Sequence, residues 1–442
     1  MKTVAFYTLG CKVNQYETNG MTAKFLEYGY SIVEFGEIAD IYVINTCTVT
    51  AMSDKKSRTV IRRAKSLNEK GNVVVTGCYS ETAKEEVQKI SEVDLIVGNN
   101  EKKDIVEIVE EYIENSCRGG FPYPPGQKGK KLMTKAVEQE EFMDFGATVS
   151  IDRTRLIIKV QDGCDNFCAY CIIPYAKGRA RSRRIDSVIS EIKCAVEKGV
   201  KEVVITGIEI SSYGKGLAGN VSLIDLLEEV NNIEGLERIR LGSLEPNTIS
   251  LDFVSRLSKL DKICNHFHLS LQSGCDETLK RMNRKYSVKE FEEKVTLLRS
   301  AFPDMALTTD IIVGFPGETE EEFKKTYEFL KEIGFSKMHV FKYSSRKGTV
   351  ASRMENQIDA KEKEIRSKKL IELSDRNEKE FIKQYINRKV LVLFEKKRGS
   401  VIKGHTSNYI VVKSICKADV SNEIKTVEIK KQEGTELIGN IL

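Results

Sequence analysis

Apolar and polar residues follow two alternating periods along most of the chain. Short apolar runs of strand length alternate with amphipathic stretches of helical spacing. Within residues 1–116 the expected strands are Val4–Thr8, Ile41–Asn45, Asn72–Thr76 and Leu95–Val97, and the expected helices are Tyr16–Glu27, Asp54–Ser66 and Ala83–Ile90. Strands that alternate with helices predict a parallel α/β sheet with right-handed crossovers.

The same alternation returns in residues 150–378. Six apolar runs are expected to be strands: Leu156–Val160, Glu202–Thr206, Arg238–Leu241, His266–Leu271, Ala306–Val313 and Met338–Tyr343. Six consecutive β/α units predict a partial or complete β/α barrel. Residues 117–149 interrupt the pattern and hold three of the seven prolines, which indicates a linker between two domains.

The last part of the chain has a different pattern. A charged helix at Lys361–Ile386 leads into three short apolar runs with basic residues in the turns, at Val390–Glu395, Asn408–Lys413 and Thr426–Ile429. This pattern is typical of a small antiparallel β-barrel or sandwich. Residues 379–442 are therefore predicted to form a separate carboxy-terminal domain.

The charge distribution says more than the total charge. The 442 residues carry 70 Lys and Arg against 65 Asp and Glu, but residues 379–442 alone carry 13 against 7. The chain has no apolar run of about 18 residues and no signal-peptide pattern, so we expect a cytoplasmic protein without a membrane partner. Its 11 cysteines are then expected to be buried thiols, metal ligands or nucleophiles rather than disulfides.

Three cysteines stand close together after the first predicted barrel strand. Cys164, Cys168 and Cys171 form a Cys-x-x-x-Cys-x-x-Cys motif at the mouth where barrel active sites lie. Three thiolates can hold three irons of a [4Fe–4S] cluster and leave the fourth iron open, whereas zinc would need a fourth local ligand. The alternative is a group of three buried structural cysteines.

This motif, opening a six-strand β/α barrel with an aromatic Tyr170 before its last cysteine, resembles the radical S-adenosylmethionine (SAM) superfamily. The resemblance implies that the open iron chelates SAM and that the cluster's electron releases a 5′-deoxyadenosyl radical, which attacks inert C–H bonds. It also implies SAM contacts at strand ends, namely Gly207, Glu245, Gln272 and Gly314 together with Tyr170. Each of these could equally be a scaffold residue.

Cys11, Cys47 and Cys78 are far apart in sequence, yet each follows the end of a predicted strand. Because the carboxyl ends of parallel strands share one edge of the sheet, the three thiols are expected to converge. The pattern predicts a second three-cysteine cluster. Three unrelated buried cysteines are the alternative.

Two such clusters in one chain resemble the methylthiotransferases over essentially the whole length, with a carboxy-terminal TRAM domain that binds RNA. The runs LGCKVNQYET at 9–18, NTCTVT at 45–50 and CIIPYAKGRARSR at 171–183 are similar to the branch that acts on N6-threonylcarbamoyladenosine in tRNA, although Lys177 stands where arginine is usual. The resemblance implies methylthiolation of C2 of that adenosine at position 37, with SAM as radical source and methyl donor and the second cluster delivering sulfur. It further implies the tRNA anticodon stem-loop and an electron donor such as flavodoxin or ferredoxin as partners.

Basic residues gather at three places that an RNA could contact. The predicted phosphate contacts are Arg179, Arg181, Arg183 and Arg184 beside the radical motif and Lys396, Lys397 and Arg398 in the last domain, with a further group at Lys280, Arg281, Arg284 and Lys285. A solvated charged face is the alternative for each group. Cys117, Cys194, Cys264, Cys275 and Cys416 lack partner spacing and are predicted to be structural.

Several other functions remain open at this point. Within the family, the substrate could be isopentenyladenosine in tRNA or an aspartate of a ribosomal protein. Outside it, the chain could be an iron–sulfur electron carrier or sensor with RNA affinity, or a zinc-bound RNA-binding protein. No feature indicates a DNA partner.

Overall fold

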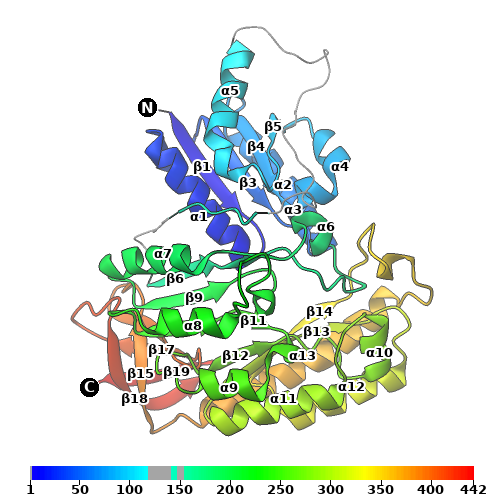
Figure 1. The fold of residues 1–442 in the computed structure, drawn as a ribbon, viewed down its shortest axis with the longest axis vertical. Coiled ribbons are helices and arrows are strands. Elements are labelled where there is room, and N and C mark those ends of the chain that lie inside the picture. Colours follow the sequence, from blue (N-terminus) through cyan, green and yellow to red (C-terminus); the bar gives the residue numbers. More distant parts are fainter. Residues whose placement is uncertain (1, 118–140, 147–153) are drawn as a thin grey trace.

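The computed structural model describes residues 2–117, 141–146 and 154–442 (Figure 1). Most of the predicted linker 117–149 therefore lies outside the described residues. The described chain contains no helix that is long and apolar enough to span a membrane.

The amino-terminal domain is a five-stranded parallel sheet with helices on both faces. Its strands are β1 (Thr3–Thr8), β2 (Ser31–Val33), β3 (Ile41–Thr46), β4 (Asn72–Gly77) and β5 (Leu95–Ile96), in the order β2-β1-β3-β4-β5. The helices are α1 (Lys12–Glu27), α2 (Ala51–Leu67), α3 (Cys78–Thr82), α4 (Lys84–Gln88), η1 (Lys102–Asp104) and α5 (Ile105–Cys117). β3 is buried along its whole length between two apolar cores. The four predicted strands are confirmed, and the short, half-exposed β2 was not predicted.

The central domain is an open β/α barrel. Its strands form two parallel sheets, β10 (Arg238–Leu241), β9 (Glu202–Thr206) and β6 (Arg155–Lys159), then β11 (Ser243–Leu244), β12 (His266–Leu269), β13 (Ala306–Val313) and β14 (Lys337–Lys342). A bridge from Ile239 to Ile263 joins the two halves. The outer layer is α7 (Ile185–Glu197), α8 (Leu223–Asn231), α9 (Leu251–Leu257), α10 (Asp276–Arg281), α11 (Val288–Ala301) and α12 (Glu320–Ile333). The main apolar core lies between these helices and the strands, which leaves the concave face of the strands to polar side chains.

Helix α13 (Ala360–Lys383) leads to a closed five-stranded barrel in the order β15-β16-β17-β19-β18. The strands are β15 (Lys389–Phe394), β16 (Val401–Thr406), β17 (Val411–Ile415), β18 (Ile424–Glu433) and β19 (Glu436–Ile441). The barrel is mixed rather than wholly antiparallel, because β17 and β19 pair in parallel. Sequence analysis missed β16 and β19, each of which carries a glycine where neighbouring strands approach closely: a Cβ on Gly404 would lie 2.4 Å from the carbonyl oxygen of Leu393.

In Figure 1 the amino-terminal domain lies above the central domain, and the carboxy-terminal barrel lies at the left, beside the ends where the central strands begin. Helix α3 packs against α6 (Ile173–Lys177), and α1 packs against the edge strand β6. Beyond β14, Arg346 forms an ion pair of 2.6 Å with Asp54 of α2. These contacts fix the two domains around the interface where the candidate site lies.

Candidate functional site

The motif cysteines Cys164, Cys168 and Cys171 lie in the loop between β7 (Gln161–Asp162) and α6, and all three are partly buried. The loop needs glycine at its start, because Gly163 has φ +70° and a Cβ there would lie 1.9 Å from the carbonyl oxygen of Arg179. The amide of Cys164 donates to the Gly178 oxygen (3.1 Å), and that of Cys171 donates to the Cys168 oxygen (2.9 Å). The loop is therefore held in a defined shape with its three thiols together.

A pocket of about 250 Å³ opens beside this triad. Its lining is Asn166, Cys168, Glu209, Ser211, Glu245, Asn247, Thr248, Asn283, Arg284 and Lys285. Arg284 donates to the Sγ of Cys168 (3.2 Å) and forms an ion pair of 2.5 Å with Glu245. Among the residues described, this pocket offers no histidine and no further cysteine, which fits a cluster with one iron open to a bound ligand.

Arg284 is a site residue whose position sequence reasoning did not identify. We predicted it as part of a basic surface group, but its side chain is only 4 % exposed. Burial alone would lower the pKa of its guanidinium, yet the surrounding Tyr170, Tyr286 and Glu245 hold that pKa well above its usual range. The permanent charge therefore lies directly beside the cluster cysteines.

Among the predicted SAM contacts, Glu245 alone lines this pocket. Gly207 lies against Gln161, where a Cβ would come within 2.9 Å of the glutamine Cβ, and Gly314 has φ +68° and lies against the Lys363 side chain. Gln272 has φ +70°, and its backbone hydrogen-bonds to Asp310 and Ile312 of β13. Tyr170 packs edge-on against Phe315 at 6.4 Å between ring centroids. These four have structural roles here, and their contact with SAM stays a prediction.

Burial dominates the electrostatics of two of the motif thiols. It raises the pKa of Cys164 and of Cys171 to about 12. A thiol in such a place stays protonated at neutral pH unless a metal displaces the proton. The triad therefore suits metal binding better than nucleophilic catalysis.

The second triad lies at the carboxyl edge of the amino-terminal sheet. Cys11 caps α1 directly after β1, Cys47 follows β3, and Cys78 begins α3 after β4. β1, β3 and β4 are adjacent and parallel, and a Cβ on Gly10 would lie 2.7 Å from the Sγ of Cys47. The predicted convergence is therefore confirmed for the strand ends, and it brings three thiols to one edge.

A buried charge network lies between the two triads. Glu17 of α1 is fully buried and accepts from the Nζ atoms of Lys102 (2.5 Å), Lys177 (2.6 Å) and Lys159 (2.9 Å). Asp162 of β7 pairs with Lys159 (2.7 Å) and with Arg181 (3.0 Å).

Two carboxylates in this network face four cations. Burial raises the pKa of the Cys78 thiol to about 12, and the nearby Lys177 and Lys102 act in the opposite direction. The excess positive charge thus favours anionic thiolate ligands at the second triad.

The basic run beside the motif turns out to be divided between the interior and the surface. Arg181 and Arg183 are buried, and Arg183 pairs with Glu191 and with Asp144 (2.8 Å). The prediction that these two side chains contact RNA is wrong for this structure, because they join α1, β7 and α7. Arg179 and Arg184 are exposed and remain candidates.

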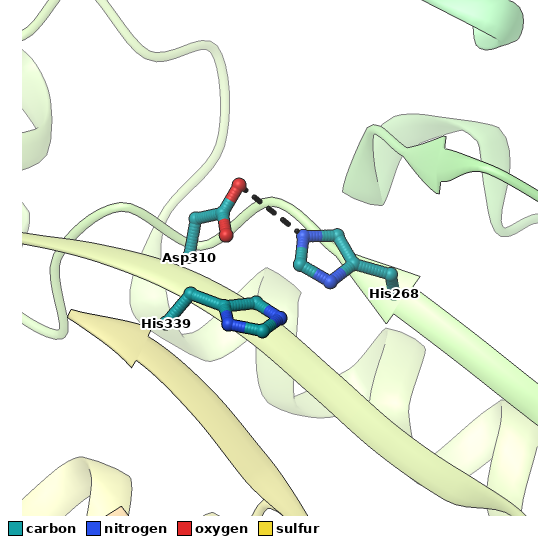
Figure 2. A group of neighbouring side chains, drawn as sticks. All are labelled: His268, Asp310 and His339. Carbon is teal, nitrogen blue, oxygen red and sulfur yellow. Dashed lines mark ion pairs between the residues drawn. The ribbon is translucent and has the colours of Figure 1, made fainter. Parts of the chain in front are cut away.

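Histidines line the concave face of the barrel strands. Figure 2 shows His268 of β12, Asp310 of β13 and His339 of β14 turned toward one another, with His268 Nε2 lying 3.3 Å from Asp310. Their three potential ligand atoms lie within 4.8 Å of one another. His268 also contacts Thr308 Oγ1 through Nδ1 (3.0 Å), whereas its Nε2 faces Asp310 without a hydrogen bond.

The remaining predicted residues are placed as follows. In the carboxy-terminal barrel, Lys396 and Arg398 line a large pocket, whereas Lys397 donates from Nζ to the carbonyl oxygens of Lys417 and Ala418. Cys264 and Cys275 are buried, and Cys194 and Cys416 are partly buried. The Cys117 side chain lies outside the described residues.

Comparison with known proteins agrees with this geometry. A family model described as the radical SAM superfamily matches residues 158–330, and one described as the uncharacterized protein family UPF0004 matches residues 3–98. The chain is 43 % identical to a protein of Bacillus subtilis named threonylcarbamoyladenosine tRNA methylthiotransferase MtaB, over 98 % of this chain and 94 % of that one. A Thermotoga maritima protein of the same name is 37 % identical over 93 % and 91 % of the two chains.

Relatives named for another substrate, and proteins of known structure, have lower sequence identity to this chain. A Clostridium tetani protein named tRNA-2-methylthio-N(6)-dimethylallyladenosine synthase is 34 % identical over 98 % of this chain and 94 % of that one. Among solved structures, the radical SAM methyltransferase TsrM of Kitasatospora setae is 17 % identical with a TM-score of 0.56, covering 77 % of this chain and 73 % of that chain. That likeness concerns the fold alone.

Proposed function

Since this chain belongs to the radical SAM methylthiotransferase family, we propose that it methylthiolates C2 of N6-threonylcarbamoyladenosine at position 37 of tRNA, giving 2-methylthio-N6-threonylcarbamoyladenosine. The observation that carries the proposal is the pair of cysteine triads, which flank the contact between α3 and α6. One triad alone would suffice for a radical enzyme of many kinds. Two triads at one interface match a reaction that must both activate a C–H bond and insert sulfur.

In this proposal Cys164, Cys168 and Cys171 would hold the radical cluster, and Cys11, Cys47 and Cys78 would hold the sulfur-delivering cluster. When bound, SAM and the radical cluster supply hydrogen abstraction, and SAM also supplies the methyl group. Methylthiotransferases of this family use SAM and two [4Fe–4S] clusters.

The protein itself holds and orients these groups. Arg284 donates to the sulfur of Cys168, and Glu245 fixes the guanidinium. Tyr170, Gly207, Gln272 and Gly314 are proposed, with Glu245, as SAM contacts.

For the substrate, we propose that the tRNA anticodon stem-loop binds across the barrel mouth and the TRAM domain, at residues 379–442. The exposed Arg179 and Arg184 and the pocket-lining Lys396 and Arg398 support this, because phosphate contacts need accessible cations. A cytoplasmic location and a flavodoxin or ferredoxin as electron donor complete the proposal.

Nucleoside mass spectrometry on tRNA from a deletion strain tests substrate and activity together. We expect 2-methylthio-N6-threonylcarbamoyladenosine to disappear, N6-threonylcarbamoyladenosine to accumulate and the wild-type gene to restore the product. A matched pair of complementing variants, Cys47→Ala and Cys416→Ala, should fail and succeed respectively.

Other outcomes of that measurement select another substrate. Loss of methylthiolated isopentenyladenosine would indicate the activity named for the 34 % identical relatives. Unchanged tRNA together with an altered ribosomal protein would indicate the aspartate substrate. Protein that contains zinc and little iron, or that forms no 5′-deoxyadenosine with SAM and dithionite after anaerobic reconstitution, would refute the radical mechanism itself.

A further inference from the structure

A pocket of about 730 Å³ lies between the amino-terminal domain, the concave face of the barrel and the carboxy-terminal barrel. Six cationic side chains line it, those of Lys12, Arg155, Arg240, Lys396, Arg398 and Lys403. The lining contains one carboxylate, that of Glu395. The pocket is therefore strongly positive, and it is separate from the one beside the radical triad.

Some of these cations are already neutralised within the protein. Arg240 donates to Glu202 at 2.7 Å, and Lys403 pairs with Glu436 at 2.8 Å. Glu395 is shared between Arg155 and His405.

Two donors in the pocket have no partner among the described residues. The Nη1 atom of Arg155 is buried and has no hydrogen-bond partner among the described residues. Lys12 makes no hydrogen bond or ion pair with its ammonium among the residues described, and its side chain is open to the pocket. An unsatisfied buried donor such as the Nη1 atom of Arg155 is costly, and an anionic ligand would relieve that cost while pairing with the free ammonium of Lys12.

The position of Lys12 indicates which anion this is. Lys12 directly follows Cys11, the first cysteine of the second triad, and its side chain lines the pocket, so the pocket reaches to within one residue of the triad that would deliver sulfur. In a purine, N1 is bonded to C2 and to C6, the carbon that carries N6, whereas the sugar and its phosphates are attached at N9 on the other ring. A cation beside the sulfur-delivering cysteines is thus placed for a group on N6 rather than for the nucleotide's own phosphate.

An aromatic ring completes the pocket. Tyr409 has φ +70°, and the guanidinium groups of Arg155 and Arg240 lie over its ring, 5.2 Å and 4.6 Å from the centroid. Arg155 is thereby held against the ring with its Nη1 free to donate. A planar guanidinium beside a free ammonium is a suitable pair for a carboxylate.

We propose that Lys12 and Arg155 bind the carboxylate of the threonylcarbamoyl group and so distinguish this base from adenosines with a neutral N6 substituent. This proposal rests on the function proposed above and adds the residues that recognise the substrate. An RNA backbone phosphate has similar anionic oxygens and is the competing source of the anion.

The test uses the full-length reconstituted enzyme without reductant and two synthetic anticodon stem-loops. One carries N6-threonylcarbamoyladenosine, and the other carries the same base with its carboxylate converted to the primary amide, which removes the charge and little else. Dissociation constants are measured for the wild type, Lys12→Met, Arg155→Met and the control Lys259→Met, whose lysine is exposed just after α9 ends.

We expect the wild type and Lys259→Met to bind the acid roughly 10- to 100-fold more tightly than the amide, as for hydrogen bonds to a charged group. Lys12→Met should lose most of this preference while its affinity for the amide stays unchanged. Arg155→Met also removes an ion-pair partner of Glu395, so only the direction of its effect is compared. It too should lower the preference for the acid stem-loop over the amide.

Equal weakening of both stem-loops by Lys12→Met would overturn the proposal, since it would identify a backbone phosphate as the anion. A wild type without preference for the acid would overturn it too. Adding reductant and SAM to the wild type separates this from the proposed function: product formed without a binding preference refutes only the carboxylate site, and no product from the acid stem-loop refutes the function.

Discussion

Replacing Glu17 by glutamine should destabilise the joint between the amino-terminal domain and the barrel. The glutamine keeps the size of the side chain but removes the charge that three buried ammonium groups share, at 2.5 Å, 2.6 Å and 2.9 Å. Lys159 retains Asp162 and Lys102 retains the Asn45 side chain, whereas Lys177 loses its only ion pair within the described part of the chain.

The magnitude follows from the cost of unpaired buried charge. Removing one partner of a buried ion pair costs about 3–5 kcal/mol, because the remaining charge stays out of water. For a unit of 150–250 residues this lowers the melting temperature by about 6–20 °C. We expect the interface between the two domains to open at a lower temperature in the variant, since the network joins α1 to β6, β7 and α6.

Differential scanning calorimetry and hydrogen exchange on α1 and β6 would measure this effect, with Glu27→Gln as the matched control. Glu27 lies on the same helix but is exposed, so its change should cost less than about 0.5 kcal/mol. Equal melting temperatures for the two variants would refute the view that Glu17 holds the domains together.

The effect should also depend on pH. Burial alone would raise the pKa of Glu17, but Lys102, Lys159 and Lys177 outweigh it and hold that pKa well below its ordinary value of 4.5. A depressed pKa gives stability that is complete above the unfolded value and is lost as pH falls toward the folded one. The difference between wild type and Glu17→Gln should therefore be constant at neutral pH and narrow below about pH 4.5.

Three further outcomes test the site. Cys168→Ala should lose half of the iron and all SAM cleavage, whereas Cys47→Ala should lose half of the iron and keep SAM cleavage, as measured by iron and 5′-deoxyadenosine assays. SAM cleavage that is lost in Cys47→Ala and kept in Cys168→Ala would show that the roles assigned to the two triads must be swapped. Arg284→Gln, which removes charge and a donor to the Cys168 sulfur, should make the reduction potential of the radical cluster more negative in a titration followed by electron paramagnetic resonance, and an unchanged potential would contradict that role. Gly163→Ala should abolish assembly of the radical cluster, since its Cβ would strike backbone, while Gly434→Ala, with φ +64° and open space around it, should cost only about 1 kcal/mol in thermal unfolding.

The convergence of the amino-terminal cysteines could be predicted, because it follows from the topology of the sheet alone. A parallel sheet brings its strand ends to one edge, so Cys11, Cys47 and Cys78 could be placed together without knowing any distance. The strands of the sheet and of the barrel could be predicted as well, because each is a short apolar run in the sequence. Strands β16 and β19 were missed because their glycines, needed for close packing in a small barrel, hide the apolar alternation.

The charges were not predictable in the same way. Sequence shows Arg181, Arg183 and Arg284 as members of basic runs, and nothing local separates a buried arginine from an exposed one. The partner of Arg183 on α7, Glu191, is close in sequence, but the partner of Lys177, Glu17, is 160 residues away. Which cation is free for RNA is decided by such distant partners, and they appear only once the domains are in contact.

The carboxy-terminal barrel is fixed to the strand bases through main-chain acceptors. Arg238 donates to the carbonyl oxygens of His405 and Leu391, and Arg240 donates to those of Ser407 and Thr406. Every folded barrel of this topology presents those carbonyls, whatever side chains it carries. These four bonds therefore tolerate sequence change in the appended domain, whereas the bonds that the Glu395, Ser407 and Asn408 side chains make across the same joint would have to be kept in any chimaera that docks correctly.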